Sequence, residues 1–225
     1  MTAMPGPSTH VILRDIYDRL FRAYGPQHWW PAETPTEVVV GAILAQNTAW
    51  ANAERAIANL KRAGCLSLSA LRDLSEKELA RLIQPSGTYR VKAARLKAFV
   101  DVVWRDHQGS LDALVGGRLP EARRRLLAIR GVGPETADAI LLYAAGHATF
   151  VVDAYTQRIL RRHFVIAPGA SYEATRLLFQ QHLPRDTVLF NEYHALLVAL
   201  GKKHCRSRAA CTGCPLEDIA HDERL

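Results

Sequence analysis

Apolar residues recur along most of this chain at the three- and four-residue spacing of amphipathic helices. Helix starts are marked by Thr36 and by the capping box of Ser75 and Glu78. Strand-like residues are dense only at 149–152, so the pattern predicts an all-α chain after a disordered lead over residues 1–9. The expected helices lie near residues 10–24, 37–44, 49–60, 76–83, 92–104, 120–128, 134–147, 154–163, 172–183 and 188–202.

A short turn, Gly131-Val132-Gly133-Pro134, joins two of these predicted helices. Glycine gives the backbone freedom of a tight turn, and proline suits the first helical position. The amides of the turn and of the following helix can hold an anion such as a phosphate. Downstream, Asp153 follows two apolar residues and precedes another helix. It is the carboxylate that we select as catalytic, and the alternative is that it only caps that helix.

Composition narrows the class of protein. The chain has 225 residues with 48% hydrophobic content, enough for a sizeable core. Its 29 basic residues against 22 acidic ones give a net charge of +7, which favours a polyanionic partner. No apolar run is long enough to span a bilayer, and residues 1–10 lack a signal-peptide pattern, so we expect a cytoplasmic protein. In that reducing compartment the cysteine cluster near the C-terminus is expected to bind metal.

Three features occur together: Leu-x-x-Ile-Arg-Gly-Val-Gly-Pro-Glu-Thr-Ala ending at Ala137, Val-Val-Asp ending at Asp153, and the cysteine cluster. With them, residues 16–215 resemble the helix-hairpin-helix DNA glycosylase superfamily. The resemblance is to its endonuclease III-like branch, including the related group that contains a 3-methyladenine glycosylase. It implies a monomer that binds double-stranded DNA and does not associate with a membrane.

The resemblance also implies how the chain is organised. A helical barrel at residues 27–147 is expected to contain the hairpin. Residues 1–26 and 148–225 are expected to form a second, helical domain with an iron–sulfur loop. DNA would lie between these lobes, with Asp153 at its base. The hairpin residues expected at the DNA are Gly131, Gly133, Glu135 and Thr136.

The aspartate after the hairpin assists cleavage of the base–sugar bond in this family. An ionised carboxylate there stabilises positive charge on the sugar or orients the attacking water. Bifunctional members carry a lysine where this chain has Glu135, and that lysine forms a Schiff base with the sugar. Because a carboxylate cannot form an imine, we expect base removal without a lyase step. The alternative role of Glu135 is an acid favoured in a first helical turn.

A glycosylase holds its flipped base between aromatic faces, which also attract a cationic alkylated purine. By resemblance to the alkyl-purine branch, Trp29, Pro31, Trp50 and Lys202 are the base-pocket candidates. Trp30 is expected to pack in the core. Packing in the core is also the alternative role for the other tryptophan candidates. For Lys202 the alternative is a lysine that satisfies carbonyls at a helix C-terminus.

Two further residues stand where the family inserts side chains into the duplex. Gln46 matches the glutamine that fills the gap left by the flipped base, with a buried helix-capping role as the alternative. Thr88 stands where the family has a leucine. Because threonine fills less space between bases, strand opening is expected to be weaker or shared with Tyr89.

The segment Cys205-x5-Cys211-x2-Cys214 resembles the loop in which four thiolates hold a [4Fe–4S] cluster. The fourth cysteine is expected at position 220, which is alanine in this chain. The resemblance therefore implies three cysteine ligands and one non-cysteine ligand. Candidates for that ligand are His221, Asp222, Asp218 and water. A labile cluster, a zinc site using His204 or His221, and a loop without metal remain open. Cys65 is expected in the other lobe.

Together these features predict a monofunctional DNA N-glycosylase of base excision repair that acts on alkylated purines. One alternative is a catalytically silent DNA-damage-binding protein. Another is a glycosylase for oxidised pyrimidines or mismatches. Release of free base from damaged DNA separates the enzyme from the silent binder.

Overall fold

The computed structural model describes residues 8–224, so most of the predicted disordered lead lies outside the described residues. Within this range the chain is helical, as predicted, and residues 149–152 are extended without forming a strand. The one β-type contact among residues 8–224 is an isolated bridge between Cys205 and Ala209. No helix in this range has the length and apolarity needed to cross a bilayer.

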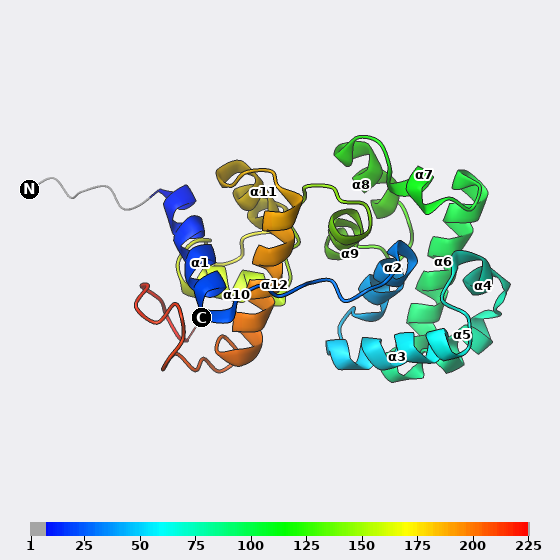
Figure 1. The fold of residues 1–225 in the computed structure, drawn as a ribbon, viewed down its shortest axis with the longest axis horizontal. Helices are drawn as coiled ribbons and strands as arrows, with labels where there is room; N and C mark the ends of the chain where they lie inside the picture. The colour runs from blue at the N-terminus through cyan, green and yellow to red at the C-terminus, as the bar shows by residue number, and fades with distance from the viewer. Residues whose placement is uncertain (1–7, 225) are drawn as a thin grey trace, which may run out of the picture. The chain divides into compact units, whose positions relative to one another are not determined.

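The described residues divide into two compact units: residues 8–29 with residues 148–224, and Trp30–His147. Figure 1 labels the helices of both. The first unit contains α1 (Thr9–Tyr24), α10 (Ala154–Arg162), α11 (Tyr172–His182) and α12 (Thr187–Lys203). The second contains α2 (Pro35–Leu44), α3 (Trp50–Arg62), α4 (Leu68–Asp73), α5 (Glu76–Leu82), the 3-10 turn η1 (Gln84–Ser86), α6 (Tyr89–His107), α7 (Leu111–Val115), α8 (Leu119–Leu127), α9 (Pro134–Ala139) and the π-helical segment η2 (Ile140–Ala144).

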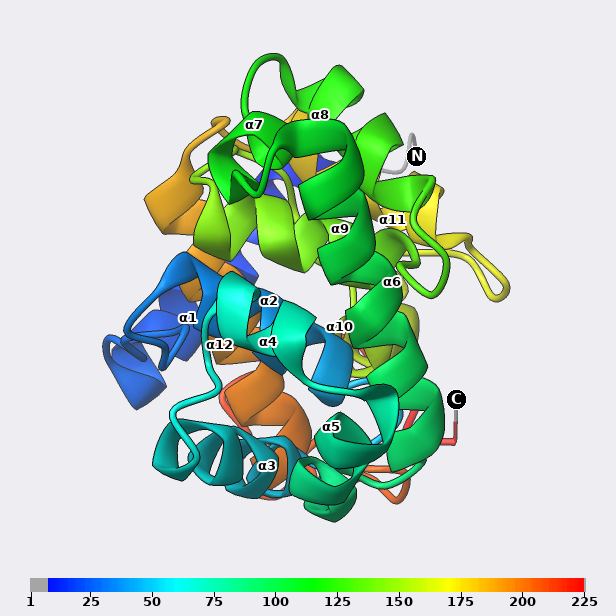
Figure 2. The same cartoon turned by 90° about the vertical axis from the view of Figure 1, so that its right-hand side faces the viewer.

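Helix α2 is the centre of the second unit. Every residue from Glu37 to Leu44 is buried, so this helix lacks the polar face of a surface helix. It contacts α3, α6, α9 and η2. Around it, α3 and α5 lie side by side, and α6 runs along α4 and α5 toward α7 (Figure 2). The end of α2 is thereby fixed, and the segment that follows it carries Gln46.

Helix α12 is the central helix of the first unit, as α2 is of the second, and it contacts α1 and α10. The Tyr193 hydroxyl donates a 2.8 Å hydrogen bond to the Leu13 carbonyl, which joins α12 to α1. The Phe150 ring stacks on Phe179 and meets Phe190 and Tyr193 edge-on. This packing anchors the extended segment that leads to Asp153.

Several helix boundaries differ from those expected. Helix α2 is capped by Thr34, whose Oγ1 accepts from the Glu37 amide, and not by Thr36. Pro35 at the first helical position favours this earlier start because it lacks the amide hydrogen that a helix leaves unpaired there. Helices α4 and α7 were not expected, since segments of 6 and 5 residues are too short to show a helical period. The predicted capping box of Ser75 and Glu78 is confirmed.

A buried lysine joins two loops of the second unit. Lys92 is 1% exposed, and its Nζ donates to the carbonyls of Leu44 at 2.9 Å and Ser86 at 2.6 Å. Desolvation lowers the pKa of this amine. The two carbonyls precede the segments that carry Gln46 and Thr88, so one side chain holds both DNA-facing candidates in place.

Replacing Lys92 by methionine should destabilise the protein by about 2–4 kcal/mol. The substitution keeps most of the volume but leaves two carbonyls without their charged donor, and loss of the buried charge offsets part of that cost. Urea unfolding followed by circular dichroism measures the change.

Lys97→Met is the matched control on the same helix. Lys97 donates to the carbonyls of Leu71, Arg72 and Leu74, but it is only half-buried, so water can replace its bonds. We expect its loss to cost less than the loss of Lys92. Equal stability of Lys92→Met and the unchanged protein would contradict the bracing role.

Candidate functional site

The hairpin between α8 and α9 has one position that only glycine suits. Gly131 has a φ of +90°, and a Cβ added there would lie 2.3 Å from Cγ of Arg95. Gly133 ends the turn as the N-cap of α9, with Pro134 as the first helical residue. A Cβ at Gly133 would meet nothing within 4 Å. The strict requirement therefore lies at Gly131, and open space surrounds Gly133.

A buried ion pair fixes the two hairpin helices. Arg123 donates from Nε and Nη2 to the two carboxylate oxygens of Asp138, at 2.9 and 3.0 Å. Asp138 is fully buried, and such a two-pronged contact sets the orientation of both side chains. Sequence analysis did not predict this pair, because the two residues are 15 positions apart and lie on different helices.

Gln46 is hydrogen-bonded to the hairpin. Its Nε2 donates to the Gly131 carbonyl at 3.1 Å and to Oγ1 of Thr136 at 2.9 Å. Its Oε1 accepts from Arg95, a residue that sequence analysis did not select. Any movement of Gln46 into DNA must exchange these contacts for contacts to bases. Thr136 is buried and serves this network, whereas Glu135 is exposed in the first turn of α9.

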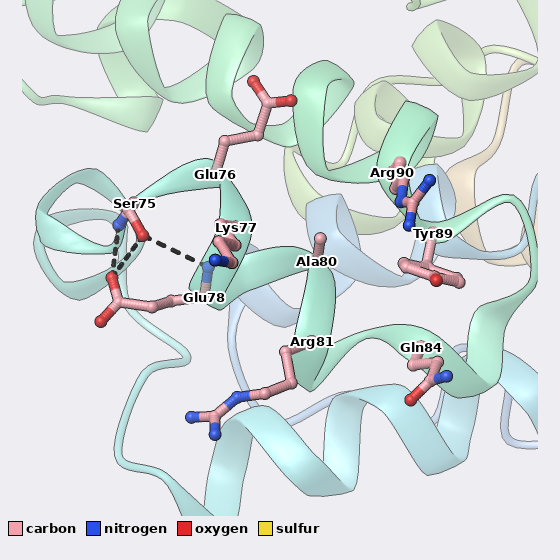
Figure 3. Close-up of a pocket in the computed structure, with 9 residues that line it drawn as sticks. All are labelled: Ser75, Glu76, Lys77, Glu78, Ala80, Arg81, Gln84, Tyr89 and Arg90. Carbon is pink, nitrogen blue, oxygen red and sulfur yellow. Dashed lines mark hydrogen bonds between the residues drawn. The ribbon is translucent and has the colours of Figure 1, made fainter.

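Thr88 lies at an exposed loop tip before α6. Its φ of 38° and ψ of 34° are left-handed, a conformation that a β-branched residue seldom adopts. An open groove beside this tip is lined by side chains from α5 and the start of α6. Figure 3 shows the capping box at one side of the groove and Gln84, Tyr89 and Arg90 at the other. Its full lining is Ser75, Glu76, Lys77, Glu78, Ala80, Arg81, Gln84, Tyr89 and Arg90.

Asp153 caps α10 in the first unit. Its Oδ1 accepts a 2.7 Å hydrogen bond from the Thr156 amide, and the side chain is 14% exposed. Its Oδ2 lies 3.8 Å from Nε2 of His194, a buried residue on α12. Burial lowers the pKa of His194, and the Asp153 charge partly opposes this shift. Forty-one residues separate the two side chains (153 to 194), so sequence analysis missed His194.

The tryptophan candidates fall into both units. In the second unit the Trp30 ring lies 4.9 Å from Trp50, edge to face, and 5.0 Å from Tyr143. Trp30 also covers Gly41, where a Cβ would come within 3.1 Å of the indole. Trp30 is therefore packed against Trp50, which is the pocket candidate. The contact of Tyr143 with Trp30 was not predicted from the sequence. Pro31 is exposed nearby in sequence.

The other two pocket candidates belong to the first unit and lie together. Nζ of Lys202 is 5.9 Å from the centre of the Trp29 ring. This distance is within the range in which an ammonium group is attracted to an aromatic face. Lys202 is exposed near the end of α12, so its amine is not confined to capping the helix.

The three C-terminal cysteines line one small cavity of the first unit, together with His163, His204 and His221. The loop is tied to α10 by arginines. Nη1 of Arg162 donates to Sγ of Cys205 at 3.2 Å and to the Arg206 carbonyl at 2.7 Å. Nε of Arg158 donates to the Cys205 carbonyl at 2.8 Å. Neither arginine was selected from the sequence, because both precede the loop by more than forty residues.

The ligand atoms of Cys211, His221 and Glu223 lie within 4.8 Å of one another. Burial and Glu223 raise the pKa of the Cys211 thiol to about 11. A tetrahedral zinc ion with Zn–S bonds of about 2.3 Å would require sulfur atoms about 3.8 Å apart. Within residues 8–224, the 4.8 Å group does not include Cys205 or Cys214. The three sulfurs therefore do not all lie within 4.8 Å of one another.

The chain was compared with known proteins. A family model described as HhH-GPD superfamily base excision DNA repair protein matches residues 40–185. A Methanocaldococcus jannaschii protein, assigned provisionally as a DNA repair glycosylase, is 46% identical over 205 residues, covering 91% of this chain and 93% of the relative. A thymine-DNA glycosylase of Aeropyrum pernix is 27% identical over 206 residues, with 88% of each protein covered.

Solved structures share the fold. A 3-methyladenine DNA glycosylase of H. pylori, bound to 1,N6-ethenoadenine, matches with a TM-score of 0.74 and 25% identity, covering 88% of this chain and 98% of that one. A non-covalent endonuclease III–DNA complex matches with a TM-score of 0.82 and 19% identity, over 95% and 96% of the two chains. The all-helical fold and the family match agree with the hairpin motif. The chain belongs to the HhH-GPD superfamily of base excision DNA repair proteins, among the DNA glycosylases related to endonuclease III.

Proposed function

We propose that this protein is a monofunctional DNA N-glycosylase that hydrolyses the base–sugar bond of alkylated purines, working as a monomer. The observation that carries the proposal is the environment of Asp153. One carboxylate oxygen is held by the Thr156 amide, and the other lies toward buried His194 at the edge of solvent. Within residues 8–224 this carboxylate is oriented without an ion pair to arginine or lysine.

This geometry suits cleavage of an N-glycosidic bond. As the bond breaks, positive charge develops on the sugar, and a fixed carboxylate stabilises that charge or orients the attacking water. Burial keeps His194 neutral near pH 7, so it does not cancel the charge of Asp153.

The absence of an amine at residue 135 supports hydrolysis by water alone. Glu135 stands in the first turn of α9, where bifunctional relatives of the hairpin motif carry their Schiff-base lysine. The carboxylate leaves no nucleophile for imine chemistry at that position. Hairpin amides around Gly131 and Gly133 are proposed to bind a DNA phosphate, with Gln46 and Thr88 interrogating the bases.

The aromatic residues support a purine as the substrate. In the second unit Trp30 meets Trp50 edge to face and lies beside Tyr143, and this aromatic cluster is proposed to supply a face on which the base stacks. Pro31 is proposed for the same base-binding surface, and Trp29 with Lys202 in the first unit is proposed as a further base contact. The H. pylori relative holds a modified adenine, whereas the A. pernix relative is a thymine-DNA glycosylase. Mismatched thymine is therefore the alternative substrate that a test panel must include.

We also propose a [4Fe–4S] cluster in the C-terminal loop. The donor set supports this group, because three cysteines line one cavity together with His163, whose buried Nδ1 has no hydrogen-bond partner among residues 8–224. Nη1 of Arg162 donates to Sγ of Cys205, so a positively charged group lies beside this proposed ligand. When bound, the cluster supplies structural support to a loop that carries basic Lys203, Arg206 and Arg208 toward DNA phosphates, and it takes no part in base removal.

Asp153→Asn should abolish base release while leaving stability nearly unchanged. The asparagine oxygen can still accept from the Thr156 amide, so the helix keeps its cap. We expect the rate of base release from methylated duplex DNA to fall by at least about a hundred-fold. Loss of one electrostatic stabiliser from an active site lowers the rate by about this factor. Duplex binding should stay within a few-fold, as measured by fluorescence anisotropy.

Asp186→Asn is the matched control, since Asp186 caps α12 in the same unit and accepts from the amides of Val188 and Leu189. It should retain full activity. If Asp153→Asn and Asp186→Asn release base equally fast, the proposed role of Asp153 is wrong.

The unchanged protein should leave an intact abasic strand. We expect a panel of duplexes containing methylated purines, ethenoadenine, oxidised pyrimidines or a G·T mismatch to be cut only after heating in alkali, and chiefly where a purine is alkylated. Sodium borohydride should trap no covalent complex, whereas endonuclease III serves as the positive control. A trapped complex would contradict the monofunctional assignment, and no free base from any duplex would favour a silent damage binder.

His194→Gln should reduce the loss of stability at acid pH. Because the pKa of His194 is lowered on folding, the unfolded chain binds the proton first as pH falls below 6.5. Folding stability therefore decreases as pH falls below that value. Glutamine does not take up a proton, so the difference in unfolding free energy between pH 7.5 and pH 5.5 should be smaller in the variant. Urea unfolding at both pH values measures this difference. An unchanged difference would mean that His194 is not buried as the neutral form.

A further inference from the structure

We propose that Nδ1 of His163 is the fourth protein ligand of the iron–sulfur cluster. This inference rests on the [4Fe–4S] cluster proposed above, whose three cysteines leave one iron without a protein thiolate. His163 is the C-cap residue of α10, and it lies outside the cysteine loop in sequence. Its side chain lines the same cavity as Cys205, Cys211 and Cys214.

The backbone next to His163 is fastened to the cysteine loop. Arg162 donates to Sγ of Cys205 and to the carbonyls of Arg206 and Ser207. Its own carbonyl accepts from the Asp222 amide at 2.9 Å. The end of α10 is thus bonded to both ends of the loop, and these bonds hold the backbone next to His163 against the loop.

The two ring nitrogens of His163 differ in the way expected of a metal ligand. The ring hydrogen-bonds to the backbone of Ala220. Among residues 8–224, Nδ1 has no hydrogen-bond partner although it is buried, so the bond to Ala220 uses Nε2. A ligating histidine commonly donates its other ring N–H to a backbone carbonyl, which directs the lone pair of the first nitrogen at the metal. A buried nitrogen without such a partner costs free energy, and an iron atom would satisfy it.

The residue contacted by His163 is itself informative. Ala220 is the position at which cysteine spacing in the family places the fourth thiolate. In this chain an imidazole from α10 reaches the loop at that residue. The family spacing places the fourth ligand within the cysteine loop, whereas in this chain the proposed fourth ligand comes from the end of α10.

His221 is the ligand that sequence spacing favours, but among residues 8–224 only His163, of the three histidines at the cavity, has a buried ring nitrogen without a hydrogen-bond partner. Its Nδ1 lies 2.8 Å from the Ile219 carbonyl, and its Nε2 lies 3.9 Å from Oε1 of Glu223. Its ring centre is 5.3 Å from that of His163, so His221 packs beside the ligand. His204 also lines the cavity, and its Nδ1 lies 3.0 Å from the Ala210 carbonyl.

The test is pulsed electron paramagnetic resonance of the dithionite-reduced full-length protein, purified without oxygen. Iron and acid-labile sulfide are measured on the same samples. In protein labelled with ¹⁵N-histidine, we expect hyperfine coupling from one ligating nitrogen. His221→Ala should keep that coupling. His163→Cys should bind a cluster of similar iron content but lose the coupling, because a fourth thiolate replaces the imidazole.

His163→Ala should lose the coupling and lower the iron content, or release the cluster on exposure to air faster than His221→Ala. Circular dichroism distinguishes this loss from misfolding, and the wild-type spectrum decides the assignment if the variant does not fold. Absence of histidine coupling in the unchanged protein overturns the inference, as does its persistence in His163→Cys. Iron-free protein, or zinc in place of iron, overturns both the inference and the proposed cluster. Base release is scored separately, so failure of the glycosylase proposal is distinguishable.

Discussion

The hydrogen bond from the Thr156 amide to Asp153 holds the carboxylate that we propose as catalytic. This bond caps the start of α10 and orients the proposed catalytic carboxylate at the same time. The extended segment before it is anchored by Phe150 and its aromatic neighbours, and the helix after it carries Arg158 and Arg162 to the cysteine loop. Helix α10 therefore connects the candidate catalytic group at its first turn with the candidate metal site at its last turn.

In the second unit a comparable constraint acts on the DNA-facing loops. Lys92 bonds the carbonyls that precede the Gln46 and Thr88 segments, and Arg95, one turn further along α6, bonds Gln46 and packs on Gly131. Helix α6 thus orders both loops and the hairpin from a single face. A buried lysine without a carboxylate partner is costly, and its retention fits a role in holding these loops.

The proposed reaction class follows from residue types more than from shape. Glu135 stands where a lyase would need an amine, and Asp153 supplies the carboxylate that we propose for base removal. The aromatic cluster of Trp30, Trp50 and Tyr143 is the proposed stacking site for the base, and stacking alone does not select one purine. The lesion preference is therefore the property for which a substrate panel is decisive.

The sequence by itself determined the all-helical class, most helix positions, the hairpin and its family, because these depend on local spacing and on backbone preferences of glycine and proline. It also pointed to Asp153, since a cap is defined by its own neighbours in the chain. Only the tertiary structure brought His194 to Asp153, Arg95 to Gln46, and His163 to the cysteine cavity. Each of these pairs joins residues from different helices, and helix packing, which no local period encodes, decides which distant side chains meet.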